Sequence, residues 1–321
     1  MDRIDLIAEC KDAASIGIAG HIRPDGDCIG STLALKMYLE KVFPDKEVCA
    51  YFDDPPTIFS CIKGMDTVDH TYAPHAPFDV FIALDTVPER LSGAENYFRQ
   101  ARKTINIDHH QSNASGKGMV NYVEPEASST AELIYLLMEK QYVDVFIAEA
   151  IYIGMIHDCG VFHYSCTSPR TMRVAADLME YGFDFPSLID KTFYEKTYTQ
   201  NLLMGRVLLD STLCLDGYMI ASHITKETLE SYGALPKHLD GIVNQLRITR
   251  GVQVAVFMYE LEQGQYKVSL RANGAVNVAN VAEKFGGGGH ERAAGCSLDG
   301  TYEEVLERIE AAIAQERKIT V

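Results

Sequence analysis

The chain has 321 residues, of which 45 are acidic and 29 basic, so its formal net charge is −16. This balance argues against holding a long nucleic-acid backbone, because such binding needs Lys and Arg surfaces that release counterions. The length exceeds what one hydrophobic core usually accommodates, so we expect two domains. With 47% hydrophobic residues, the chain has enough apolar material for sizeable cores.

The cysteine pattern and the N-terminus indicate a reduced, cytoplasmic protein. The eight cysteines form neither a CxxC pair nor a framework spacing. The first residues, MDRIDLIAECKDA, lack a basic segment followed by an apolar one. No apolar run approaches the roughly 18–20 residues that a membrane span needs, so we expect no membrane partner.

Short apolar runs alternate with amphipathic stretches in the first half of the chain. Strand-like runs cover 14–21, 47–52, 78–85 and 103–110, and helical patterns cover 28–42, 128–140 and 144–158. Ser128 or Ser129 is a suitable N-cap for the second helix, and Asp144 for the third. Alternating strands and helices predict an α/β fold with a doubly wound, mostly parallel sheet.

The pattern changes in the second half. Residues 185–211 look like a helical connector, and they are followed by strand patterns at 218–224, 252–262 and 265–271, then by helices near 277–285 and 302–315. Gln263-Gly264 is typical of a hairpin turn. We therefore predict a catalytic domain over 1–185, a helical linker over 186–211 and a smaller α+β domain over 212–321.

Aspartate and histidine side chains follow successive predicted strands. Ligands of an open parallel sheet gather at the carboxyl ends of its strands, so these side chains should share one rim. Three of the groups follow strands and one ends a helix: His21 with Asp25 and Asp27, then Asp85, then Asp108-His109-His110, and finally His157-Asp158.

This clustering predicts a site for two divalent metal ions. Carboxylates crowded in a partly buried crevice cannot all stay ionised without cations. Mixed Asp and His ligation suits Mn²⁺, Fe²⁺ or Co²⁺. Two such ions can hold a bridging, hydroxide-like water and screen a phosphoryl group, which is the chemistry of phosphoester hydrolysis.

Each feature also has an ordinary structural explanation. Asp25-Gly26-Asp27 is a common turn, a strand-end aspartate such as Asp85 is often a helix cap, and the second histidine of a pair is usually a hydrogen-bonding partner. Their joint occurrence at successive strand ends favours the metal site over these separate explanations.

The second domain contains a glycine run within FGGGGHERAAG, residues 285–295. Consecutive glycines let backbone N–H groups approach an anion without obstruction by Cβ, and His290 with Arg292 adds donors or charge. A flexible loop between a helix and a strand is the alternative. Arg271, at the end of a predicted strand, either faces the same space or is simply solvated.

Together these motifs resemble a known family. HIRPDGDCIGS at 21–31, LD at 84–85, DHH at 108–110 and HD at 157–158 resemble the four motifs of the DHH phosphoesterases. GGGGHERAAG resembles the signature of the DHHA1 domain. The compact two-domain form is most similar to the NrnA-like branch, whose members hydrolyse nano-RNA and 3′-phosphoadenosine 5′-phosphate.

The resemblance implies a role for each site residue. One metal ion, most simply Mn²⁺, would be held by His21, Asp25 and Asp85, and the second by Asp27, Asp85, His109 and Asp158. His110 would face the scissile phosphate, and Asp108 would orient the histidine pair. The substrate would be gripped in the DHHA1 domain by Arg271, Gly287, Gly288, Gly289 and His290.

We therefore expect an enzyme that hydrolyses short oligoribonucleotides and 3′-phosphoadenosine 5′-phosphate through a metal-bridging hydroxide. The expected partners are short RNAs or nucleotide bisphosphates, not long duplexes, and a homodimer is left open. One alternative is a phosphodiesterase for linear or cyclic dinucleotides such as pApA, pGpG or c-di-AMP. The other is a nucleotide-binding regulator without turnover, against which the intact ligand set argues.

Overall fold

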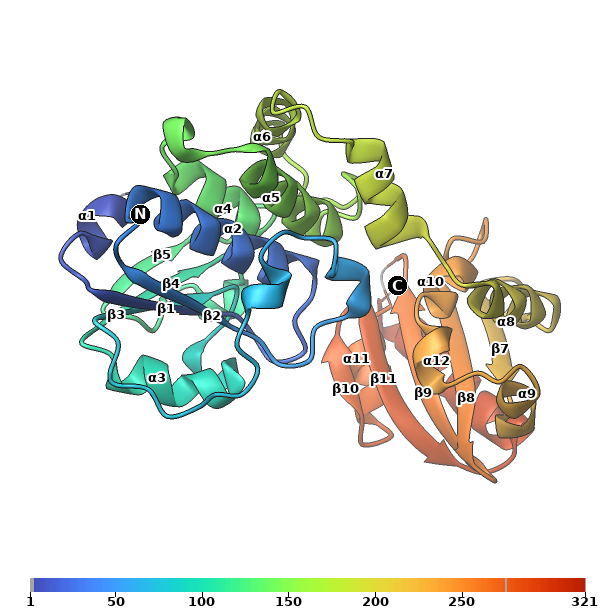
Figure 1. The fold of residues 1–321 in the computed structure, drawn as a ribbon. Coiled ribbons are helices and arrows are strands. Elements are labelled where there is room, and N and C mark those ends of the chain that lie inside the picture. The colour runs from blue at the N-terminus through green and yellow to red at the C-terminus, as the bar shows by residue number, and fades with distance from the viewer. Residues whose placement is uncertain (1–2, 275, 321) are drawn as a thin grey trace. The chain divides into compact units, whose positions relative to one another are not determined.

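A computed structural model describes residues 3–274 and 276–320 (Figure 1). The chain divides into two compact units, Met1–Glu195 and Lys196–Val321. This division lies inside the segment 186–211 that the sequence predicts as a linker. The exact boundaries of that linker stay a prediction.

The first unit is built on a parallel sheet, as the sequence predicts. Its strands pair in the order β2-β1-β3-β4-β5, and every pair is parallel. The strands are β1 (Ser15–Ala19), β2 (Glu47–Tyr51), β3 (Val80–Leu84), β4 (Lys103–Asp108) and β5 (Val120–Val123). The order reverses between β1 and β3, so the carboxyl ends of these two strands flank the switch point where such folds bind ligands.

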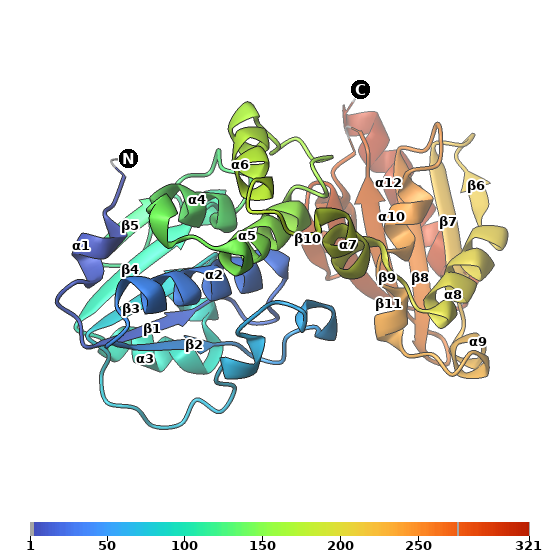
Figure 2. The same ribbon diagram turned by 45° about the horizontal axis from the view of Figure 1, so that its top comes forward.

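Helices cover both faces of this sheet (Figures 1 and 2). One face packs against α2 (Gly26–Val42), α4 (Thr130–Leu137) and α5 (Val145–Asp158), and the other against α3 (Glu95–Gln100). The remaining helices are α1 (Leu6–Cys10), α6 (Pro169–Met179), α7 (Phe185–Ile189) and a π-helical turn at Asp190–Tyr194. The doubly wound arrangement is therefore confirmed.

The predicted caps can be compared with the helix starts. Ser129, not Ser128, caps α4, because its hydroxyl accepts the backbone N–H of Glu132 over 3.0 Å. Asp144 caps α5, as predicted. The helices α2 and α5 touch directly, since a Cβ on Gly30 would lie 2.4 Å from the carbonyl oxygen of Ala150. Only glycine permits this approach.

The second unit contains a mixed sheet in the order β10-β11-β9-β8-β7-β6, in which β7 and β8 are parallel and the other pairs antiparallel. Its strands are β6 (Thr212–Cys214), β7 (Met219–Ile224), β8 (Val254–Glu262), β9 (Gln265–Ala272), β10 (Gly288–His290) and β11 (Ala293–Asp299). The hairpin predicted at Gln263-Gly264 joins β8 to β9.

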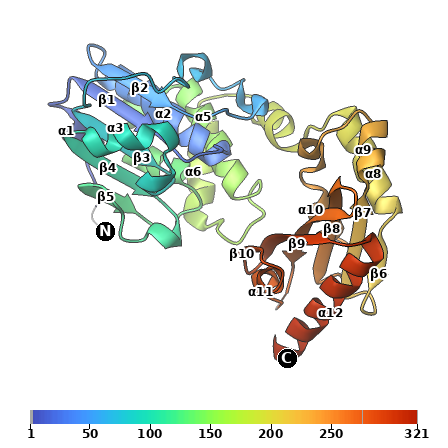
Figure 3. The ribbon, with the colours of Figure 1, turned by 90° about the horizontal axis from the view of Figure 1, so that it is seen from below.

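Helices also cover both faces of the second sheet (Figure 3). One face packs against α11 (Val278–Glu283) and α12 (Tyr302–Thr320), and the other against α8 (Tyr198–Leu209), α9 (Lys226–Ser231) and α10 (Ile242–Arg247). Helix α8 falls within the predicted linker, yet its Leu203 and Val207 are fully buried against this sheet. No helix in the described part of the chain is long and apolar enough to cross a membrane.

Candidate metal centre

The first unit brings the predicted ligands to one edge of its sheet. His21 follows β1, Asp85 follows β3, and Asp108 is the last residue of β4. Asp27 lies in the first turn of α2, and Asp158 is the last residue of α5. Within the described residues, three groups place ligand atoms within 4.8 Å of one another: His21-Asp25-Asp85, Asp27-His109-Asp158 and Asp85-His109-His110.

Asp85 connects these groups. Its Oδ2 lies 3.4 Å from Nε2 of His21, while its Oδ1 lies 3.5 Å from both Nε2 of His109 and Nδ1 of His110. The two oxygens of one buried carboxylate therefore face two different sets of ligands. A carboxylate in this position can offer one oxygen to each set.

The second group centres on His109. Its Nε2 lies 2.9 Å from Oδ2 of Asp158 and 3.9 Å from Oδ2 of Asp27. Asp27 is completely buried, whereas the side chain of Asp158 is partly exposed. Within this group, Asp27 is therefore shielded from solvent, whereas Asp158 is accessible to it.

Asp25 combines a structural role with proximity to the centre. It caps α2, because its Oδ1 accepts the backbone N–H groups of Asp27 and Cys28 at 3.1 Å each. Its other oxygen lies 3.6 Å from Nε2 of His21. The motif is therefore the start of a helix and not a turn, and the cap leaves one oxygen of Asp25 facing the cluster.

Asp108 forms hydrogen bonds with both histidines that follow it. Its Oδ1 accepts the backbone N–H groups of His109 and His110 and also lies 2.8 Å from Nδ1 of His110. Its Oδ2 accepts a hydrogen bond of 2.7 Å from the side-chain amide of Asn113. Both oxygens are therefore used within the protein, and Asp108 belongs to none of the three ligand groups.

Sequence reasoning missed the asparagines that support this edge. Asn106, buried within β4, donates to the carbonyl oxygens of Ala83 and Thr86 on either side of Asp85. The backbone of Asp85 itself has φ of 59°, a left-handed conformation that Asp tolerates better than most residues. The sequence does contain an indication of this role, because Asn106 is a polar residue inside the otherwise apolar run Ile105–Ile107.

The spacing between Asp27 and Asp158 follows from helix packing. Asp27 opens α2 and Asp158 closes α5, and these helices meet through glycines. A Cβ on Gly26 would lie 2.3 Å from Cγ of His157, and one on Gly154 would lie 3.1 Å from Oδ1 of Asp27. Any larger side chain at these positions would move the ligand-bearing ends apart.

Charge crowding at the centre shifts the pKa values of its groups. Burial and the neighbouring charge of Asp85 raise the pKa of Asp27 well above its usual range, and burial also raises the pKa of Asp158. Burial alone would lower the pKa of His109, but hydrogen bonds with Asp158 and Asp85 outweigh it and raise the pKa to about 12. Likewise, hydrogen bonds with Asp25 and Asp85 outweigh burial and raise the pKa of His21 to about 10.

The residues at this edge fit bound divalent cations. Among the described residues, the carboxylates of the three groups form ion pairs only with histidines, not with lysine or arginine. Crowded carboxylates with no permanent cationic partner are stabilised by bound cations. Oxygen and imidazole donors together suit first-row divalent ions of the Mn²⁺ type.

In the second unit, two predicted substrate-binding residues lie in one row of the sheet. The register pairs His290 on β10 with Ala293 on β11, and Ala293 with Arg271 on β9. Directly opposed residues of antiparallel strands point to the same face, so Arg271 and His290 flank the small side chain of Ala293. The glycine run forms the β10 edge of this hairpin, so at Gly288–His290 it is a strand and not a loop.

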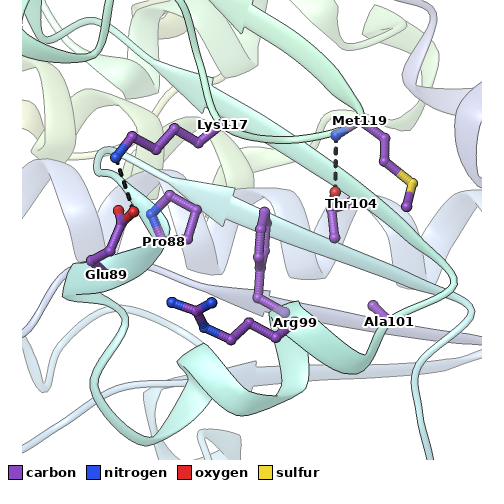
Figure 4. A pocket seen from close by; sticks show the side chains of 8 residues that line it. Pro88, Glu89, Arg99, Ala101, Thr104, Lys117 and Met119 are labelled. Atoms are coloured by element: carbon purple, nitrogen blue, oxygen red, sulfur yellow. Dashed lines mark hydrogen bonds and ion pairs between the residues drawn. The ribbon is translucent and has the colours of Figure 1, made fainter.

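A pocket of about 390 Å³ in the first unit is a separate feature (Figure 4). Lys117 lies 2.9 Å from Glu89 across it, and Arg99 bonds with Glu95. The residues that line it include none of the predicted ligands: Pro88, Glu89, Phe98, Arg99, Ala101, Thr104, Lys117 and Met119. Because its charged side chains are already paired, with one another or with Glu95, it offers no comparable chemistry.

Comparison with known proteins identifies the class. The model of the DHH family, N-terminal domain, matches residues 15–155, and that of the DHHA1 domain matches residues 217–316. The chain belongs to the DHH family, with a DHHA1 domain after the DHH domain, as the motifs predicted.

Individual relatives indicate which members of the DHH family this chain is similar to. The chain is 33% identical to the bifunctional oligoribonuclease and PAP phosphatase NrnA of Thermus thermophilus, over 96% of this chain and 94% of the relative. It is 31% identical to the protein of that name from Bacillus subtilis, over 92% and 93%. Among solved structures, an exopolyphosphatase-related protein from Bacteroides fragilis is similar, with 26% identity, a TM-score of 0.85, and coverage of 97% and 94%.

Proposed function

We propose that this chain is a metal-dependent phosphoesterase that hydrolyses short oligoribonucleotides and 3′-phosphoadenosine 5′-phosphate. The observation that carries the proposal is the position of Asp85, whose two oxygens face two separate sets of histidines. The names of the relatives at 33% and 31% identity supply the substrates. The intact ligand set favours an enzyme over a regulator without turnover.

We assign the ligands as the resemblance implies. His21, Asp25 and Asp85 would hold one cation, and the other would be held by Asp27, Asp85, His109 and Asp158. Bound divalent ions, for which we propose Mn²⁺, supply an activated water and neutralise charge on the phosphoryl group. The protein contributes the fixed spacing of the carboxylates, since Asp27 and Asp85 are buried and cannot swing into solvent.

His110 is proposed to contact the scissile phosphate. Its Nδ1 is held by Asp108, and this hydrogen bond raises the pKa of His110. With Nδ1–H donated to Asp108, Nε2 can donate to a phosphate oxygen or to the leaving group when the ring is protonated, the form that the raised pKa favours. The side chain is 44% exposed, which leaves it accessible to a substrate.

The second unit is also proposed to bind substrate. Arg271 and His290 flank Ala293 on one face, so an anion above Ala293 can meet donors from both sides. Among the glycines 287–289, the N–H of Gly287 already donates to the carbonyl oxygen of Ala282, so we propose that Gly288 and Gly289, on the edge strand β10, approach a phosphate or a base. The cysteines, all free in the structure, agree with the reducing cytoplasm that we propose as its location.

The decisive experiment is a hydrolysis assay with Mn²⁺ on two substrates, 3′-phosphoadenosine 5′-phosphate and a 5′-labelled RNA ladder of short oligomers. Asp85→Asn is the test variant, because Asn tolerates the left-handed backbone at this position. Asp12→Asn, an equal charge change at an exposed residue of the same unit, is the control.

Cleavage of both substrates, fastest for the shortest RNAs and lost in Asp85→Asn, would support the proposal. Cleavage of one substrate alone would restrict the enzyme to that activity. If neither is cleaved, dinucleotides such as pApA, pGpG and c-di-AMP are the next substrates to test, and saturable binding without turnover would indicate a regulator. Full activity in Asp85→Asn would refute the metal assignment.

A further inference from the structure

The first turn of α4 touches two predicted metal ligands at once. The backbone N–H of Thr130 donates to Oδ2 of Asp27 over 2.7 Å, and the N–H of Ala131 donates to Oδ1 of Asp27 over 2.8 Å. The hydroxyl of Thr130 donates to Oδ1 of Asp85 over 3.1 Å. Thr130 is completely buried, so water cannot replace these donors.

We propose that Thr130 is a positioning residue of the metal centre: its hydroxyl holds Asp85 in a metal-binding orientation, relative to an Asp27 that is held by the backbone of the same helix turn. This inference rests on the proposed function. Rotation of a carboxylate about its last side-chain bond is broad and costs little, so burial alone does not fix where its oxygens point. In Asp27, one donor on each oxygen fixes the plane of the carboxylate, and in Asp85 the hydroxyl of Thr130 fixes Oδ1; the remaining lone pairs are left for a cation.

Thr130 also relates the two groups to each other. Asp27 belongs to the group with His109 and Asp158, and Asp85 belongs to the group with His21 and Asp25. A single residue that donates to both carboxylates therefore fixes the separation between the two groups. Outer contacts of this kind are what set ligand orientation in metal sites generally.

The start of α4 is itself held in place. The carboxylate of Glu132, which is completely buried, accepts hydrogen bonds from the hydroxyls of Ser128 and Thr171. Arg170 of α6 forms an ion pair with the same carboxylate. Since the first turn is tied to α6 as well as to the ligands, Thr130 has little freedom to shift away from Asp27 or Asp85.

The test compares metal affinity in three variants. Thr130→Val keeps the shape of the side chain and removes the hydroxyl that donates to Asp85, whereas Thr130→Ser keeps this hydroxyl. The backbone donors to Asp27 are the same in both variants. Thr32→Val is the matched control, because Thr32 is as buried as Thr130 and its hydroxyl has no hydrogen-bond partner among the described residues. Mn²⁺ is titrated into the metal-free full-length proteins by calorimetry, and circular dichroism checks the fold.

We expect Thr130→Val to bind Mn²⁺ about 10–100-fold more weakly than the wild type, as loss of such an outer contact typically does. Thr130→Ser and Thr32→Val should bind like the wild type. Excess Mn²⁺ should restore part of the turnover of Thr130→Val. Wild-type affinity in a folded Thr130→Val would overturn the inference, and so would an equal loss in Thr130→Ser, which would point to packing of the methyl group.

Should Thr130→Val fail to fold, Thr130→Ala and Thr130→Ser together decide the matter, since only the second retains the hydroxyl. Equal affinities in these two would overturn the inference. A failure of the proposed function would give a different experimental result. A wild type that binds Mn²⁺ but cleaves neither substrate would refute the activity, while the comparison of affinities would still decide the role of Thr130.

Discussion

The side-chain amide of Asn113 donates a hydrogen bond of 2.7 Å to Oδ2 of Asp108. Asp108 in turn holds the ring of His110 through its other oxygen. The same amide also donates to Oδ1 of Asn106, which supports the turn that carries Asp85. Asn113 therefore connects the two loops that follow β3 and β4, and the orientation of His110 depends on it.

Replacing Asn113 tests this connection. Asn113→Ala leaves Oδ2 of Asp108 without its donor in a buried place, which costs about 1–3 kcal/mol of stability. Asn113→Asp should cost more, because it puts a second carboxylate next to Asp108. Urea unfolding of the metal-free proteins measures both. An Asn113→Asp protein as stable as the wild type at neutral pH would contradict this view of the network.

In the glycine run, the same substitution can be compared at three neighbouring positions, 287–289, with and without space for a side chain. A Cβ on Gly287 would lie 2.2 Å from the carbonyl oxygen of Gly295, and one on Gly289, where φ is 149°, would lie 2.5 Å from that of Ala293. A Cβ on Gly288 would meet nothing within 4 Å. Gly287→Ala and Gly289→Ala should therefore lower the melting temperature, and Gly288→Ala should not.

Gly288→Ala is then informative about binding. If a substrate anion approaches the backbone at this strand, the added methyl group should raise KM while the melting temperature stays unchanged. Thermal unfolding and steady-state kinetics on the same preparations separate the two effects. A Gly288→Ala protein that melts as early as Gly287→Ala would show that the strand tolerates no side chain at all.

The ion pair between Arg170 and Glu132 is expected to stabilise the first unit. Arg170→Met leaves the buried carboxylate of Glu132 without its cation. Breaking a fully buried pair costs about 3–5 kcal/mol, but Arg170 is one third exposed, so we expect about 1–3 kcal/mol. Glu132→Gln in the same protein should recover part of this loss. A double-mutant cycle by chemical denaturation measures the coupling, and strictly additive effects would argue against it.

Stability should fall at alkaline pH, in part because of Cys10. Burial raises the pKa of its thiol from 9.0 to about 12. The unfolded chain therefore loses this proton near pH 9 while the folded chain keeps it, so stability is fully present below pH 9 and declines above it. Each pH unit in this window removes about 1.4 kcal/mol per group.

Cys10→Ala removes this contribution. Its unfolding free energy, measured between pH 9 and 11, should fall less steeply with pH than that of the wild type. Other buried groups, including Cys159, whose pKa burial raises to about 11, keep part of the slope in both proteins. Parallel slopes would show that Cys10 ionises equally in the folded and unfolded chains.

Much of the centre could be predicted because its residues directly follow apolar runs. His21, Asp85 and Asp108 occur where β1, β3 and β4 end, and a parallel sheet brings such ends together whatever the details of packing. The order of these residues along the chain was therefore sufficient to place them at one edge. The cap of α5 at Asp144 could also be predicted, because it depends only on residues next to it in the sequence.

The supporting contacts were beyond prediction because they join distant segments. Thr130 and Asp27, which form a hydrogen bond, are 103 positions apart in the sequence. The sequence SST at 128–130 is typical of an ordinary helix cap. The strands β6 and β10 have three residues each, too few for any alternation to show. Gly288 in particular belongs to a strand, although a run of glycines is more typical of a loop.

The contact between α2 and α5 at Gly30 allows two properties of the protein, its substrate preference and its metal preference, to change independently. The distance between the ends of these helices is fixed by backbone touching backbone, not by the loops around the centre. Sequence drift in the parts of those loops that carry no ligand can therefore alter which substrates are accepted without altering the separation of Asp27 from Asp158. Related enzymes that share this helix contact should diverge in substrate preference sooner than in metal preference.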